Sequence, residues 1–224
     1  MRGSPRAPAL ERREAGTIPG HWRTLIALLV IPLLSLACNG KDVRPLTSSE
    51  LANLIPASEE VSALLPNAQL ISAGPLTNEQ LIQRAAGQFR KDPRADVEKY
   101  GRVTGYSANF GEPAGFEVHA FKSASGASQA LKDYLTDERK LFEAAPTVFQ
   151  SVEAFAVTDV GDEAQGLRLQ PQVANPSTII FVRIANMLAR VQATDADKEV
   201  AGKAALDLAT KVAVKADAML QKLR

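Results

Sequence analysis

The chain is poor in the residues that most often carry covalent or metal chemistry. It contains one cysteine and two histidines in 224 residues, and 5% of its residues are aromatic. A single cysteine excludes an internal disulfide, a CxxC redox pair and metal or iron–sulfur sites built from cysteine pairs. A formal net charge of +1 gives no global reason to expect nucleic acid as a partner. The composition therefore predicts no cofactor, no metal and no nucleic-acid binding.

The first 37 residues have the organisation of an export signal. Five arginines and three prolines precede residues 24–37 (TLIALLVIPLLSLA), an apolar run interrupted by Pro32. This run is shorter than the roughly 20 residues of a membrane-spanning helix, and it is typical of a signal-peptide core. Residues 35–37 (SLA) then lead directly into Cys38, the only cysteine. The arrangement resembles the lipobox of bacterial lipoproteins, in which the cysteine is lipidated and becomes the first mature residue.

The resemblance implies removal of residues 1–37 and a palmitate-bearing lipid on Cys38. The protein would then be anchored in the cell membrane or outer membrane, on the extracytoplasmic side. Ser35 departs from the pattern, because leucine is usual three residues before the cysteine. An uncleaved signal anchor and a buried core helix remain open as alternatives. The chain has 26 basic and 25 acidic residues, of which 21 basic and 23 acidic ones lie after residue 37, so the chain after residue 37 has a formal charge of −2. Its one histidine is His119.

The remaining chain predicts a tether followed by a single α+β domain. Residues 38–46 lack an apolar period and are expected to be the tether, and residues 47–224 the domain. Capping residues and apolar periods predict helices at 47–55, 58–65, 77–91, 124–143 and 196–223, and strands at 102–110, 115–122, 148–158, 166–170 and in a hairpin over 178–193 that turns at Ala185–Asn186. This order favours an antiparallel sheet with helices mainly on one face.

Three stretches of the domain carry a second resemblance. Residues 101–106 (GRVTGY), 160–164 (VGDEA) and 181–191 (FVRIANMLARV), followed by a closing helix, resemble the extracellular sensor domains of mycobacterial receptor serine/threonine kinases and related lipoproteins. The resemblance spans about residues 95–222. The chain departs from those domains in lacking their disulfides and in having Ala185 where glycine is frequent. It implies a ligand-sensing or partner-binding module and no enzymatic activity.

Alternation along the strands predicts which sheet face carries the binding site. An almost wholly aliphatic set is expected to pack under the helices: Val118, Ala120, Val152, Ala154, Leu167, Leu169, Val182, Ile184 and Val191. The complementary set mixes aromatic rings with arginines, and its ligand-binding candidates are Tyr106, His119, Arg168, Phe181, Arg183 and Arg190. Such a face suits a small anionic ligand. The alternative is that residues 47–91 fold over this face and bury the rings.

The sequence therefore predicts a lipid-anchored extracytoplasmic module that binds a small ligand or an envelope protein. A structural or chaperone-like lipoprotein is the second possibility. A hydrolase or transferase that uses Asp162, Glu163 and His119 is the third, although Gly161–Asp162 is first a turn signal and no nucleophile motif accompanies these residues.

Overall fold

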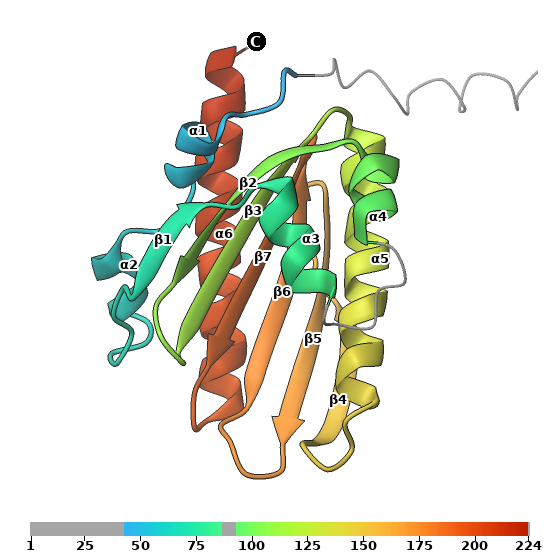
Figure 1. Ribbon diagram of the computed structural model, residues 1–224. Coiled ribbons are helices and arrows are strands. Elements are labelled where there is room, and N and C mark those ends of the chain that lie inside the picture. Colours follow the sequence, from blue (N-terminus) through green and yellow to red (C-terminus); the bar gives the residue numbers. More distant parts are fainter. Residues whose placement is uncertain (1–42, 87–92, 224) are drawn as a thin grey trace, which may run out of the picture. The chain divides into compact units, whose positions relative to one another are not determined.

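The computed structural model describes residues 43–86 and 93–223 of the chain (Figure 1), and Cys38 and residues 1–37 lie outside them. In chain order the elements are α1 (Ser48–Ala52), α2 (Ser58–Ser62), β1 (Ser72–Pro75), α3 (Asn78–Ala86), α4 (Pro93–Tyr100), β2 (Arg102–Asn109), β3 (Ala114–Phe121), α5 (Ala124–Glu143), β4 (Phe149–Ala156), β5 (Glu163–Pro171), β6 (Ser177–Ile184), β7 (Met187–Thr194) and α6 (Lys198–Leu223). All seven strands pair antiparallel in the order β1-β2-β3-β7-β6-β5-β4. The predicted α+β class with one antiparallel sheet is confirmed.

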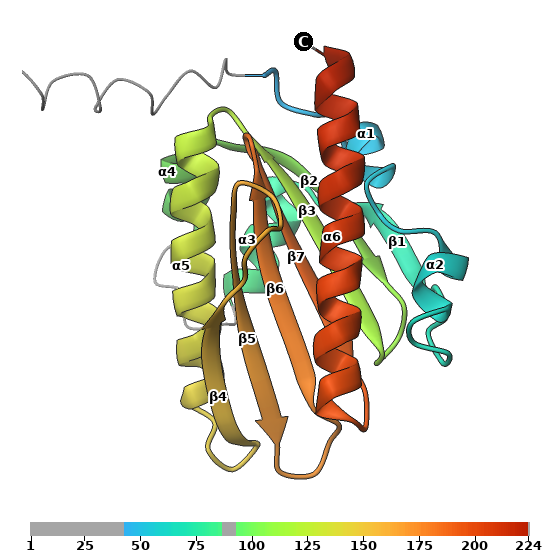
Figure 2. The ribbon, with the colours of Figure 1, turned by 180° about the vertical axis from the view of Figure 1, so that it is seen from behind.

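Helix α6 packs along one face of the sheet, named here the α6 face (Figure 2). Its buried stripe is rich in alanine, with Ala201, Ala205, Ala209 and Ala216 fully buried. Such short side chains let the helix backbone approach the strands, where Val182 and Val191 belong to the same apolar cluster. The short helices α1 and α2 add Leu51 and Val61 to this cluster, so these two helices lie on the α6 face, whereas α3 lies on the opposite face (Figures 1 and 2).

Helix α5 packs on the opposite face, named here the α5 face. The Ser123 hydroxyl caps its first turn by accepting from the backbone N–H of Gly126 at 3.1 Å. Leu131 of the helix packs against Ile179 and Phe181 of β6. The long helices are thus divided between the two faces, whereas the sequence placed the helices mainly on one. The continuous apolar run 179–182 of β6 is the sign of a strand that is buried on both faces.

The end of the expected tether belongs to the domain. Val43 and Leu46 are buried in the cluster on the α6 face, and the carbonyl of Val43 accepts a hydrogen bond from Asn186 Nδ2 at 3.0 Å. Arg44 forms an ion pair with Glu50 of α1. The sequence analysis assigned residues 38–46 to a tether and did not predict this attachment, because two apolar residues spaced three apart show no period.

Two short elements were missing from the sequence analysis. Pro93 was expected to close a helix, but it is the first residue of α4, a position where the fixed backbone angle of proline suits a helix start. Strand β1 has four residues, and its Gly74 and Pro75 argue against a strand by propensity. Its pairing with β2 is imposed by the rest of the fold.

Candidate functional site

The register of the sheet places polar residues of four strands in two neighbouring rows on the α5 face. One row contains Ser72, Asn109, Gly115 and Gln192 of β1, β2, β3 and β7. The next row contains Gly74, Ser107, Glu117 and Arg190. Both rows continue onto β6 as Ile179 and Phe181, which lie under α5. The α5 face is therefore apolar where the helix covers it and polar beside the helix.

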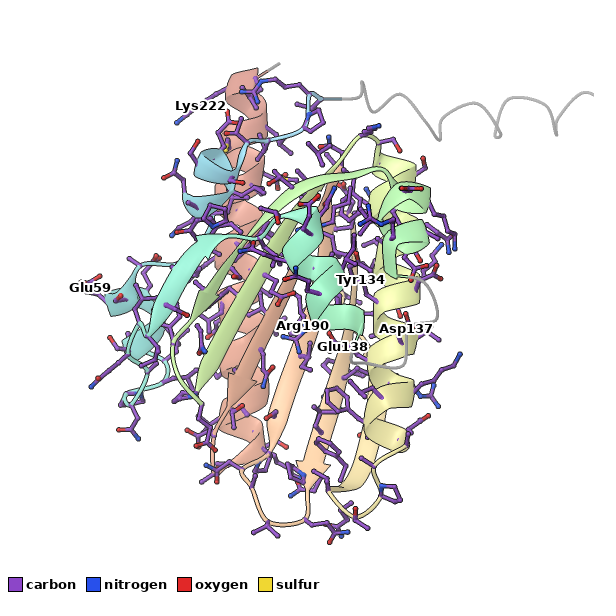
Figure 3. All side chains as sticks on the ribbon, viewed as in Figure 1. Glu59, Tyr134, Asp137, Glu138, Arg190 and Lys222 are labelled. Atoms are coloured by element: carbon purple, nitrogen blue, oxygen red, sulfur yellow. The ribbon has the colours of Figure 1, made fainter. Side chains whose placement is uncertain are left out.

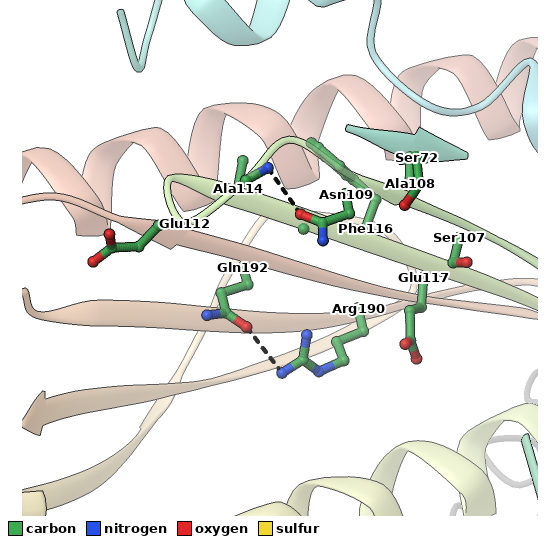
Figure 4. Close-up of a pocket in the computed structure, with 12 residues that line it drawn as sticks. Ser72, Ser107, Ala108, Asn109, Glu112, Ala114, Phe116, Glu117, Arg190 and Gln192 are labelled. Carbon is green, nitrogen blue, oxygen red and sulfur yellow. Dashed lines mark hydrogen bonds between the residues drawn. The ribbon is translucent and has the colours of Figure 1, made fainter. Parts of the chain in front are cut away.

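A pocket of about 370 Å³ opens over the polar half of these rows, and we refer to it as the sheet pocket (Figure 4). Seven row residues line it, and Gly111 and Glu112 of the β2–β3 turn contribute to its rim. A Cβ added to Gly115 would meet no atom within 4 Å, so the floor of the pocket is open at this residue. Short strand side chains form most of the lining, which keeps the conformational entropy lost on binding small.

Arg190 forms the wall of the sheet pocket next to α5. Its Nε and Nη2 atoms donate to the two carboxylate oxygens of Glu138 at 2.7 and 3.1 Å; both residues are labelled in Figure 3. Nη2 also donates to Gln192 Oε1 at 3.2 Å (Figure 4). Burial lowers the pKa of Arg190, but the Glu138 carboxylate outweighs burial and leaves the pKa raised. The charge of Arg190 is thus compensated within the chain, and the residue joins α5 to β7.

In the next row on the same face, which contains Gly105 and His119, lies a buried polar cluster around His119 and Arg102, which are 1% and 3% exposed. Arg102 Nε donates to His119 Nδ1 at 3.0 Å, and its Nη2 donates to the carbonyl of Leu76 at 2.8 Å. Because arginine only donates, Nδ1 must present a lone pair, and the proton of a neutral ring lies on Nε2, 3.6 Å from Glu117 Oε2. Gly105 leaves room for this arginine, since a Cβ there would meet Nη2 at 2.4 Å.

Asp162 and Glu163 form an ion-pair cluster with Arg183 that fixes the β6–β7 turn. Arg183 Nη1 donates to Asp162 Oδ2 at 3.0 Å, and its Nε donates to Glu163 Oε2 at 3.3 Å. Asp162 Oδ2 also accepts from the backbone N–H of Ala185, and Glu163 Oε2 accepts from the hydroxyl of Ser128. His119 and Glu163 lie in one row but three strand spacings apart, or about 14 Å. They do not face a common substrate atom.

The predicted sorting of strand residues into two faces is wrong for β2, β4 and β5. His119, Phe181, Arg183 and Arg190 share the α5 face, but Tyr106 and Arg168 lie on the α6 face. Of the set expected under the helices, Val152, Ala154, Leu167 and Leu169 are on the α5 face and the other five residues are on the α6 face. Strand β5 begins three residues earlier than expected, and alternation within it does not fix its register with β6.

The structure thus brings one of the six ligand candidates, Arg190, into the sheet pocket. Phe181 is fully buried under α5, and Tyr106 is half-buried against the cluster on the α6 face. The sequence analysis missed the polar residues Ser107, Asn109 and Gln192. The signal that could have found them is alternation: two successive strands carry glycine and polar residues on the same face.

A second hollow, of about 680 Å³, lies on the α6 face beside β4 and β5. Arg168 contributes to it, stacking 4.2 Å from the ring centre of Phe155 and lying 3.8 Å from Glu153. The side chains of Arg168 and Glu153 are 54% and 67% exposed, so a ligand would have to order both. The sheet pocket, whose walls are already ordered, is the better-formed site.

Two features are absent from the described residues. Across residues 43–86 and 93–223, no three histidine, cysteine or acidic side chains gather as metal ligands would. Within the same ranges, no helix combines the length and the apolarity needed to cross a membrane.

Comparison with known proteins gives little further guidance. No protein-family model matches the chain, and no curated protein matches it. Among solved structures, the chain is similar to the extracellular domain of PknH from Mycobacterium tuberculosis, with a TM-score of 0.43 and 13% identity over 75% of this chain and 97% of that one. This neighbour is of the kind that the sequence analysis named. At this TM-score the similarity establishes neither a common fold nor a common function.

Proposed function

We propose that the mature chain is a lipid-anchored extracytoplasmic module that binds a small polar ligand in the sheet pocket and catalyses no reaction. The observation that carries this proposal is the pair of polar rows beside α5, which leaves an open pocket on an otherwise well-packed sheet. Pockets with a rigid lining and a few polar groups are typical of small-ligand sites. The export-signal pattern of residues 1–37 supports the extracytoplasmic location.

The contacts of the candidate catalytic residues support a binding role over catalysis. His119 is buried, and its Nδ1 lone pair is engaged by Arg102, so this nitrogen is not available as a base. Asp162 and Glu163 both accept from Arg183. Each of the three groups therefore has a role in maintaining the fold.

The charges around the sheet pocket favour an uncharged polar ligand over the anionic ligand expected from the sequence. The Arg190 guanidinium is paired with Glu138, and the pocket also contains the carboxylates of Glu117 and Glu112. Asn109 Oδ1 accepts from the backbone N–H of Gly111, and Gln192 Oε1 accepts from Arg190, so both amide NH₂ groups are oriented away from those bonds. Hydroxyl or carbonyl groups on a ligand would satisfy such donors.

The decisive experiment is native mass spectrometry of the mature protein purified from its own host. We expect a retained small molecule in the wild-type protein and its loss from Gly115→Leu, because the new side chain projects into the pocket. Gly74→Leu is the matched control: it lies on the same face, also has open space around its Cβ, and does not line the pocket. Absence of any ligand, or equal loss from both variants, would contradict the assigned site.

The lipid anchor is tested separately at Cys38. We expect the mature N-terminus to be an acylated Cys38, and Cys38→Ala to release the protein from the membrane fraction, since two or more acyl chains are needed for stable anchoring. An intact residue 1 together with an unmodified thiol would contradict the lipoprotein assignment.

A further inference from the structure

We propose that the membrane faces the end of the domain formed by the β6–β7 turn, the β3–α5 connection and the C-terminal end of α6, so that the sheet pocket draws its ligand from the aqueous side. This inference rests on the proposed lipid anchor at Cys38. It adds a lipid surface as a defined neighbour of one end of the domain, and it excludes bilayer lipid as the pocket's source of ligand.

The first described residues are fixed at that end by a buried contact. Asn186, in the β6–β7 turn, is 1% exposed and donates from Nδ2 to two carbonyls, that of Val43 at 3.0 Å and that of Phe121 at 2.8 Å. One side chain thus joins the beginning of the domain to the end of β3. Figures 1 and 2 both show the start of α5 and the C-terminal end of α6 at this end.

Residues 44–47 are also held against the domain, so the chain does not rotate freely after Val43. Leu46 is 1% exposed in the apolar cluster. Arg44 makes two hydrogen bonds to the carboxylate of Glu50, and the backbone N–H of Thr47 donates to the same carboxylate at 2.8 Å. The carboxylate accepts all of these bonds, and they lower the pKa of Glu50 to about 2, with the Arg44 bond as the largest cause.

The chain between the lipid and this attachment is short. Val43 lies five residues after Cys38, and five residues span at most about 17 Å when fully extended. Helix α6 alone, from Lys198 to Lys222, is about 36 Å long at 1.5 Å per residue. The anchor is therefore shorter than the domain, and we expect the end near Lys222 to lie closer to the bilayer than the end near Lys198. An uncleaved signal anchor would impose the same orientation.

The sheet pocket lies toward the other end of the strands. Its rim is the β2–β3 turn at Gly111 and Glu112, and β3 runs from that turn to Phe121 beside the attachment. Gly115 is six residues from Phe121 along β3, or about 20 Å. With the attachment end at the bilayer, the pocket opens into the aqueous compartment.

Energy transfer from two positions on α6 tests the orientation. Lys198→Cys and Lys222→Cys place one thiol at each end of the same helix, at exposed side chains, and in the lipidated protein Cys38 offers no competing thiol. Each variant is labelled with a donor and reconstituted in vesicles that carry an acceptor on the lipid headgroup. We expect severalfold higher transfer from position 222 than from position 198.

Equal or reversed transfer in protein that floats with the vesicles would overturn the orientation while leaving the lipid anchor intact. Protein that does not float with the vesicles would contradict the anchor, and with it both the proposed function and this inference. Insertion of about 20 glycine and serine residues between Asn39 and Gly40, with a flexible span of roughly 25 Å, should make the two transfers converge. A difference that survives this insertion would show that the short connection does not set the orientation, contrary to the proposal.

Discussion

Replacement of Arg102 by methionine tests the buried polar cluster beside the sheet pocket. Arg102 is 3% exposed and connects three segments: β3 through His119, the start of α3 through Asn78, and the preceding loop through the carbonyl of Leu76. Methionine is of similar length and apolar, so the substitution removes the donors and leaves most of the volume filled. The domain should still fold, with lower stability.

The expected loss follows from the acceptors that remain. His119 Nδ1, Asn78 Oδ1 and the Leu76 carbonyl each lose a donor. The first and third of these bonds are buried, and a buried acceptor without a partner costs about 1–3 kcal/mol. Burial lowers the pKa of Arg102, which shows that burying the guanidinium is itself unfavourable, and its removal offsets part of the loss. We therefore expect the free energy of unfolding to fall by about 3 kcal/mol, or the melting temperature by about 6–12 °C for a domain of this size.

Urea unfolding of the mature domain, followed by circular dichroism, measures this difference. Arg168→Met is the matched control, because Arg168 is a half-exposed arginine on the same sheet whose ion pair with Glu153 is open to solvent. We expect the control to lose less than about 1 kcal/mol. Arg102→Lys should remain well below wild type, since one ammonium cannot replace a fork that reaches three acceptors. A loss below about 1 kcal/mol for Arg102→Met would refute the role assigned to the cluster.

Two further predictions concern stability. Ala185 has a left-handed backbone (φ 50°), which is costly for a residue with a Cβ, so Ala185→Gly should raise the free energy of unfolding by about 0.5–1 kcal/mol in urea titrations, and a decrease would contradict this account of the turn. The Lys215 ammonium and the Ala57 N–H lower the pKa of Glu60 to about 2. The contribution of the ionised Glu60 carboxylate to the free energy of unfolding is therefore complete above about pH 4.5 and is lost as the pH falls toward 2. Glu60→Gln should therefore unfold with a free energy about 1 kcal/mol lower than that of wild type at pH 7, after allowance for solvent screening, and should match wild type near pH 2. The same difference in unfolding free energy at both pH values would contradict the ion pair.

Local elements of this fold could be predicted from the sequence wherever a long period and a cap coincide. Helix α5 was expected over 124–143 and spans those residues, because Ser123 supplies the cap and a long apolar stripe follows it. The hairpin that turns at Ala185–Asn186 was also expected, and its two strands pair from Ile184 and Met187 outward. Short elements such as β1 have too few residues to carry a period.

The sorting of residues from different strands onto one face required information that alternation within a strand does not contain. Alternation separates the two faces of one strand, but the relation between strands is set by register, and a shift of one residue exchanges the faces. Arg168 and Arg183 were therefore placed together, although their strands put them on opposite faces. The ion pairs of Arg183 and Arg190 also depend on pairing across strands or helices far apart in sequence.

The extent of α5 explains why a pocket forms on this sheet and where. Seven strands make a sheet wider than one helix can cover, and α5 packs over β6 and its neighbours, where the rows end in Ile179, Phe181 and Leu167. On β3 the apolar cluster under α5 includes Phe121, at the end of the strand, and the rows farther along β2 and β3 carry Ser107, Asn109 and Glu117. An apolar residue at these positions would be exposed to water. The change of polarity along a row thus marks the edge of α5. Arg190 lies at that edge, where its guanidinium is paired with Glu138 of the helix and also lines the open pocket.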